Sequence, residues 1–182
     1  SGIALSEDRR SLYLRLQENA RWHDGVPLTT RDVKFSYEDL LTRVFGKVYL
    51  ATWVDSMEIV NDKELILHHR NVFTNSNLVA LTWFPIRPAH YYEDKDPGAP
   101  TLTPPVGSGP YRVIKFDKGY VRYERVKDYW GKDIPVNQGR YNFDIIHYDV
   151  YRDATVAREA FRKGLFDIYF ETDIRHWESS YD

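Results

Sequence analysis

The side chains that could do chemistry begin with two adjacent histidines, His68 and His69. Imidazole is a common zinc ligand, and several ligands must converge on one ion. Residues 64–70 have the pattern of a strand, in which neighbouring side chains point to opposite faces, so this pair cannot share an ion. The other histidines, His23, His90, His147 and His176, have neither His-x-His nor His-x-x-x-His spacing. The pattern therefore does not indicate a metal site.

Carboxylates are frequent in the last part of the chain, where two of them could serve as the general acid and base of glycoside hydrolysis. They are Asp144, Asp149, Asp153, Glu159, Asp167, Glu171 and Asp173. Asp153 is also placed to cap a helix, and Glu159 to lie on the solvated face of that helix. Because a sequence does not show how far apart two carboxylates lie in space, a carboxylate-dependent hydrolase stays an alternative.

Ser108 lies between two glycines, Gly107 and Gly109, and Pro110 follows. A serine nucleophile of the Gly-x-Ser-x-Gly type needs a turn from a strand into a helix, but here a predicted strand follows. The same glycines lack the GxGxxG pattern and the Lys-Ser or Lys-Thr pair of phosphate-binding loops. A tight turn in which glycine supplies a positive φ accounts for them. No catalytic constellation remains.

The charge balance argues against nucleic acid as a partner. The chain has 25 Lys and Arg against 27 Asp and Glu, a net charge of −2, whereas phosphate backbones require a concentrated basic surface. The absence of cysteine excludes disulfides and thiol nucleophiles. The 14 tyrosines and 5 tryptophans combine apolar area with a polar tip, which suits ligand clefts. We predict a binding protein without a cofactor rather than an enzyme.

The first half of the chain alternates predicted strands and helices. Leucines at every second position predict a strand over residues 11–17. Thr29 and Asp32 have the spacing of a capping box, which predicts the start of a helix. The predicted buried face of this helix consists of Val33, Tyr37, Leu40, Leu41 and Val44. Residues 53–60 and 64–70 predict a β-hairpin, residues 75–83 predict a short helix, and residues 89–92 predict a further turn.

The second half follows a loop with five prolines and three glycines over residues 93–110, which predicts a subdomain boundary. Two strands, 111–116 and 120–125, are predicted as a hairpin. Next come a strand over 143–151, a helix from Asp153 to Gly164 and a strand over 165–170. Strand, helix and strand in this order predict a βαβ unit with parallel strands. The fold class is a mixed α/β, or α+β, fold.

Three segments carry a pattern beyond these elements: Leu14–Ser36, which contains Trp22-His23-Asp24-Gly25; Val106–Arg112, with Gly109-Pro110-Tyr111; and Tyr123–Gly131, with Tyr129-Trp130. In this order they resemble the signature segments of the family 5 extracellular solute-binding proteins, the peptide- and nickel-type binding proteins of ABC importers. Residues 137–144, 151–153 and 159–164 are similar to the oligopeptide and microcin-C-type branch.

The resemblance implies a two-lobed periplasmic-binding-protein-like fold of type II that closes on its ligand. This chain resembles part of the first lobe. Residues 1–105 correspond to its small outer subdomain and residues 106–182 to a segment of its core α/β subdomain. The N-terminal strands and the second lobe of the family are absent from the 182 residues.

The resemblance also implies ligand contacts in the loop after the last predicted strand, at Phe170, Glu171 and Thr172. Relatives often have Asn where Glu171 and Thr172 stand, and Glu171 could pair with a ligand amine. Trp177 fits the pattern of this branch. Tyr49 and Trp53 are further candidates for ligand contact, and core packing is the alternative for both.

The function that the resemblance implies is capture of a peptide or peptide-like ligand in the periplasm, or at the surface of a Gram-positive host, and delivery to an ABC transporter membrane permease. A hydrolase and a ligand-binding chaperone or sensor without transport stay as alternatives. The sequence does not identify the ligand.

Overall fold

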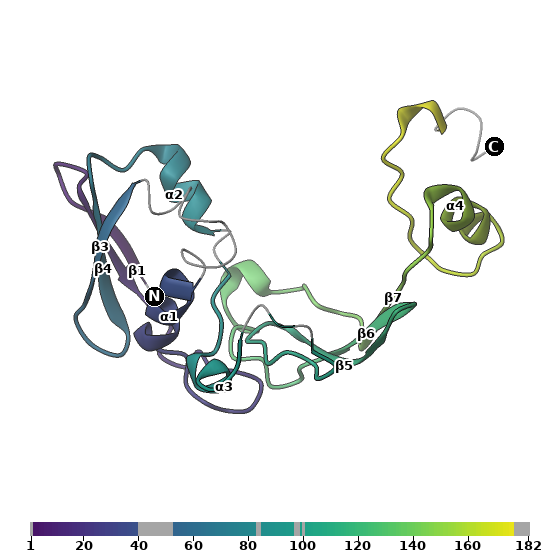
Figure 1. Cartoon of the computed structure of the whole chain (residues 1–182), viewed down its shortest axis with the longest axis horizontal. Helices are drawn as coiled ribbons and strands as arrows, with labels where there is room; N and C mark the ends of the chain where they lie inside the picture. Colours follow the sequence, from purple (N-terminus) through teal and green to yellow (C-terminus); the bar gives the residue numbers. More distant parts are fainter. Residues whose placement is uncertain (1, 40–52, 83–84, 97–98, 100, 177–182) are drawn as a thin grey trace.

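The structure is a computed structural model of the chain, and it describes residues 2–39, 53–82, 85–96, 99 and 101–176. The N-terminal part contains one sheet with helices α1 and α2 beside it, and helix α3 lies next to α1 on the side of the second sheet (Figure 1). A second sheet follows in the middle of the view, and helix α4 lies beyond it at the other end. The two sheets fall on either side of residues 105 and 106, and the subdomain division at this point stays a prediction.

The first sheet has four antiparallel strands in the order β1-β2-β4-β3. The strands are β1 (Gly2–Leu5), β2 (Ser11–Arg15), β3 (Val54–Ile59) and β4 (Glu64–His69). Leu12 faces Leu67 and Leu14 faces Leu65 across β2 and β4. This register confirms the predicted alternation, because it places the leucines of both strands on the same face. The antiparallel pairing of β3 with β4 confirms the predicted hairpin.

Strand β1 was not predicted. It has four residues, most of them exposed, and Ile3 is 66% exposed although it lies opposite Leu14. A strand this short with little burial shows no apolar alternation, so only its pairing with β2 defines it.

Three helices lie in the N-terminal part: α1 (Thr30–Asp39), α2 (Asn75–Thr82) and α3 (Ala89–Tyr92). The Asp32 carboxylate accepts a hydrogen bond from the backbone N–H of Thr29 at 2.8 Å, as expected of the residue at this capping-box position. Val33 is buried, and Tyr37 is half-buried. The other predicted core positions of this helix, at 40, 41 and 44, lie outside the described residues.

The hydrophobic core of the described chain lies between the first sheet and the helices. Its buried members are Leu12, Val33, Trp53, Val54, Leu65, Leu67 and Phe73. Side chains from β2, α1 and β4 thus meet in one cluster, and partly buried residues of α2 pack against it, so that the cluster holds α1 and α2 on the sheet.

The second sheet has three antiparallel strands in the order β5-β6-β7. They are β5 (Tyr111–Asp117), β6 (Tyr120–Arg125) and β7 (Ile145–Asp149). The β5-β6 hairpin confirms the prediction. A 3₁₀ turn, Pro135–Asn137, lies in the connection between β6 and β7.

Helix α4 (Ala154–Arg162) has both predicted caps. The Asp153 side chain accepts from the Val156 N–H at 2.9 Å, and Gly164 has a φ of 69° after the last turn. The N–H of Gly164 donates to the carbonyl of Phe161, and the N–H of Leu165 to that of Ala160. This pair of bonds is a Schellman motif, which ends the helix and turns the chain back.

The prediction of a strand over 165–170, and with it the parallel βαβ unit, is wrong for this structure. Strand β7 pairs antiparallel with β6, and residues 165–170 are in no ladder. The chain after α4 instead returns along the helix, where the rings of Phe166 and Tyr169 lie 5.6 and 5.9 Å from the ring of Phe161. A strand requires a hydrogen-bonding neighbour, and the described chain supplies none here.

Candidate functional site

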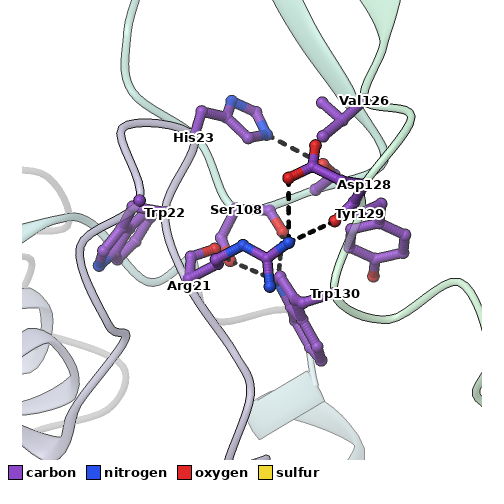
Figure 2. A pocket seen from close by; sticks show the side chains of 10 residues that line it. Arg21, Trp22, His23, Ser108, Val126, Asp128, Tyr129 and Trp130 are labelled. Carbon is purple, nitrogen blue, oxygen red and sulfur yellow. Dashed lines mark hydrogen bonds and ion pairs between the residues drawn. The ribbon is translucent and has the colours of Figure 1, made fainter.

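The three signature segments meet where the N-terminal part joins the second sheet (Figure 2). The Arg21 Nη2 atom donates to the carbonyl of Asp128 at 2.6 Å and to its carboxylate at 3.0 Å. The Ser108 hydroxyl donates to the carbonyl of Arg21 at 2.8 Å. We call the shallow pocket between them, lined by residues 21–23, 25, 108–109, 126 and 128–130, the joint pocket.

The Ser108 hydroxyl has two hydrogen-bonding partners. It donates to Arg21, and its oxygen accepts from Nε1 of Trp130 at 2.9 Å. The same indole N–H also lies 2.9 Å from the Ser108 carbonyl. Because the hydroxyl proton already points at a carbonyl oxygen, Ser108 has no arrangement for deprotonation by a base.

His23 connects the joint pocket to the loop of Gly107, Ser108 and Gly109. Its backbone N–H donates to the carbonyl of Gly107 at 2.8 Å, and its ring Nε2 donates to the carbonyl of Gly109 at 2.9 Å. A carbonyl only accepts, so the proton of the neutral ring is assigned to Nε2. A Cβ on Gly107 would lie 3.0 Å from Cε1 of His23, a tight contact that the His23 ring would have to yield to.

The charged side chains of the joint pocket, Arg21 and Asp128, hold the two parts of the chain together. The hydrogen bond from Arg21 is the main cause that lowers the pKa of the exposed Asp128 carboxyl. A carboxylate held in this way is a poor proton donor at neutral pH. The joint pocket therefore connects the two sheets, and its Arg21, Asp128 and Ser108 side chains are engaged in hydrogen bonds across this connection.

A second group of functional candidates lies beside α4. The Arg158 Nε atom donates to the Glu171 carboxylate at 2.9 Å, with side chains 8% and 4% exposed. The other carboxylate oxygen of Glu171 accepts from the backbone N–H of Asp173 at 2.9 Å. Glu171, which was predicted to meet a ligand amine, thus has an internal cation as its partner in the structure.

The remaining predicted ligand residues have different surroundings. Phe170 is 82% exposed and Thr172 is exposed. Trp53 is 6% exposed and packs edge-on against Phe73, which corresponds to its core-packing alternative. Tyr49 and Trp177 lie outside the described residues. The ligand contacts of all these residues stay predictions.

Two side-chain arrangements were not predicted from the sequence. One is the ion pair of Arg158 with Glu171, and the other is the role of Asp32 as a hub, a carboxylate that accepts three hydrogen bonds. Arg158 lies 13 residues from Glu171, and nothing in the spacing indicates the pair. Asp32 was identified as a cap, but its bonds to Trp22 and Ala89 were not predicted.

His68 and His69 have separate neighbours, as expected for adjacent strand residues. His68 contacts Ser11 and Glu58, whereas His69 stacks on Trp53. Over the described ranges, no three side chains of the metal-ligating types cluster around a common point. None of the described helices has the length and apolarity needed to cross a bilayer.

The fold defines a class of protein. The chain superposes with a TM-score of 0.75 on AppA, an oligopeptide-binding protein of Bacillus subtilis solved with a nonapeptide, over 99% of this chain and 36% of that one, at 22% identity. The fold is thus that of the type II periplasmic binding proteins, which confirms the predicted mixed α/β class.

Residues 1–182 match the profile of the bacterial extracellular solute-binding proteins, family 5, middle region, and the chain belongs to this family. It is similar to YejA of Escherichia coli K12, at 38% identity over 97% of this chain and 29% of the relative. A probable peptide-binding protein YejA of Agrobacterium fabrum is 33% identical over 100% of this chain and 31% of the relative. The chain spans about a third of the length of these curated relatives.

Proposed function

We propose that this chain is part of the substrate-binding component of an ABC importer that captures peptides or peptide-like ligands. The observation that carries the proposal is the family match over residues 1–182. The peptide class is supported by the relative that is named a probable peptide-binding protein, 33% identical to this chain. The nonapeptide bound to AppA, which has the same fold, agrees with it.

The exposed residues after α4 suit such a ligand. Phe170 offers a large apolar ring that the rest of the described chain leaves uncovered, and Thr172 offers a hydroxyl beside it. Extended peptides are bound through their backbone hydrogen bonds, while roomy, hydrated pockets tolerate varied side chains. Neither requirement needs a cofactor or a reactive group.

The proposed place of action is the periplasm, or the outer surface of a Gram-positive cell. Closure around the ligand would bury it, and the closed form would dock on the membrane permease. ATP hydrolysis would then take place in other subunits of the importer.

The test is native mass spectrometry of the full-length gene product, purified gently from its own host. We expect a co-purified mass of a few hundred to about a thousand daltons, with the mass of a short peptide. Calorimetric titration with a mixture of three- to nine-residue peptides should reproduce binding. An apo mass that persists after incubation with these peptides would contradict the proposal.

Two further measurements separate the alternatives. Peptides and oligosaccharides recovered after long incubation should be intact, whereas a hydrolase would shorten them. Deletion of the gene should abolish uptake of the bound peptide, whereas a chaperone or sensor without transport would leave uptake unchanged.

A further inference from the structure

The segment after α4 has side chains that alternate between the helix and solvent. Tyr169 packs its ring 5.9 Å from that of Phe161 and donates its hydroxyl proton to the carbonyl of Ala154 at 3.4 Å. Two residues on, Glu171 is paired with Arg158. The residues between and beside them, Ile168, Phe170 and Thr172, are exposed. The segment is therefore fixed to α4 through 169 and 171, while 168, 170 and 172 point away.

The ion pair between Arg158 and Glu171 is the most buried charged contact of this region. Its side chains are 8% and 4% exposed, whereas the neighbouring pair of Arg162 and Glu159 on the same helix is about half exposed. A buried pair is weak evidence for stability, because desolvation offsets the attraction between the charges. Its geometry is specific, however, and in some proteins such pairs select one arrangement of two elements.

The carboxylate of Glu171 also shapes the turn that follows. One oxygen accepts from Arg158 and the other from the N–H of Asp173, so the side chain links α4 to the next turn. The Arg175 guanidinium then pairs with the Asp173 carboxylate at 2.6 Å. Rotation of Glu171 toward a ligand would break these two hydrogen bonds.

We infer that Arg158 and Glu171 are positioning residues, which hold Phe170 and Thr172 toward the ligand, and that Glu171 does not bind a ligand amine. This inference rests on the proposed function. The ligand surface at this point is then formed by an aromatic ring and a hydroxyl without a net charge, so that the site should accept peptides with a free or a blocked amino terminus.

The experiment uses the full-length protein and two independent readouts. The first is the affinity for penta-alanine and for its N-acetylated form. We expect Arg158→Met and Glu171→Gln each to lower the affinity for both peptides equally, by about tenfold, because both variants release the same segment. The exchanged pair Arg158→Glu with Glu171→Arg should recover part of the lost affinity. Arg162→Met is the matched control and should change neither affinity.

The second readout does not require a ligand. A nitroxide label on Thr172→Cys, with the unsubstituted protein as background, reports the mobility of the segment by electron paramagnetic resonance. We expect a restricted spectrum that becomes mobile with Arg158→Met, recovers in the exchanged pair and is unchanged with Arg162→Met.

Two outcomes would overturn the inference. One is a label mobility that Arg158→Met leaves unchanged. The other is a Glu171→Gln variant that loses affinity for the free-amine peptide alone, which would make Glu171 a ligand contact. If the unsubstituted protein bound neither peptide, the proposed peptide specificity would fail, and the label would still decide the positioning role.

Discussion

The indole N–H of Trp22 donates to the Asp32 carboxylate at 3.2 Å, and both residues are 3% exposed. The same carboxylate accepts from the backbone N–H of Thr29 and from that of Ala89, each at 2.8 Å. One buried side chain thus connects a signature segment, the start of α1 and the start of α3. The joint pocket depends on it, because Trp22 lies between Arg21 and His23.

Replacement of Asp32 by alanine should destabilise the protein strongly. Two buried N–H donors, of Trp22 and Ala89, and the half-buried N–H of Thr29 would lose their acceptor, and leaving a buried donor unsatisfied costs about 1–3 kcal/mol. We expect a loss of at least about 3 kcal/mol in the free energy of unfolding, measured by urea titration of the full-length protein. Asp32→Asn should lower the free energy of unfolding by a smaller amount, because the amide oxygen retains part of the acceptor capacity.

The control for this prediction lies on the same helix. Glu38, whose side chain is 63% exposed, pairs with Lys34, and such surface pairs contribute about 0–1 kcal/mol. Glu38→Ala should therefore leave the unfolding midpoint nearly unchanged. Equal midpoints for Asp32→Ala and Glu38→Ala would contradict the hub role.

Replacement of Gly131 by alanine should strain the aromatic side of the joint. A Cβ at this position would lie 2.6 Å from the hydroxyl of Tyr129. The Tyr129 ring is held edge-on by Tyr141, so it cannot move freely. We expect a cost of about 1–3 kcal/mol in unfolding free energy. Gly119→Ala is the control, because a Cβ at Gly119 meets nothing within 4 Å. If Gly119→Ala lowered the unfolding free energy as much as Gly131→Ala, the steric explanation would be refuted.

The stability should fall on mild acidification because of His69. Burial, only partly offset by the Asn77 side chain, lowers the pKa of His69 below the usual 6.5. Its Nδ1 accepts from the N–H of Asn71 at 2.8 Å, a bond that only the ring unprotonated at Nδ1 can make.

Proton linkage gives the direction in which the folding stability changes with pH. Below pH 6.5 the unfolded state binds a proton at His69 more readily than the folded state. The contribution of His69 is therefore complete above pH 6.5 and is lost as pH falls through the lowered folded pKa. Thermal unfolding from pH 7.5 to 5 should show a smaller acid-induced decrease for His69→Gln than for the parent. His147→Gln, at a surface pair with Asp149, is the control. Parallel profiles for the His69 variant and the parent would refute the assignment.

Removal of the Phe170 ring should reduce peptide affinity without a loss of stability. The side chain is 82% exposed, so Phe170→Ala removes little packing from the described chain. In the closed, liganded protein the ring would be buried, which is typically worth about 1.5–3 kcal/mol. Calorimetric titration and thermal unfolding of the full-length protein test both parts. Leu102→Ala, at a 95% exposed position, should change neither quantity, and an unchanged affinity of Phe170→Ala would remove this residue from the site.

Sequence patterns were most informative where neighbours along the chain decide the structure. The leucines of β2, the capping position of Asp32 and the cap pair of Asp153 and Gly164 all have the structure predicted for them. Such features depend on contacts within a few residues, so that local spacing contains the relevant information. The family resemblance and the mixed α/β class were also recognisable at this level.

Residues 165–170 show where local patterns are insufficient. The apolar stretch after Gly164 has the composition of a strand, but a strand forms only beside a hydrogen-bonding neighbour. In this structure Phe166 and Tyr169 pack on α4 instead. The same side chains satisfy either arrangement, and tertiary contacts choose between them.

The sequence by itself determined the family and most of the local elements, and its resemblance to the family gave the residues that are predicted to contact a ligand. Only the tertiary structure decided their partners: Arg21 meets Asp128 across 107 residues, and Arg158 occupies the carboxylate of Glu171 across 13. The path of the whole chain sets such pairings, because contacts between distant residues depend on how every intervening element packs, whereas propensities and caps depend on adjacent residues alone.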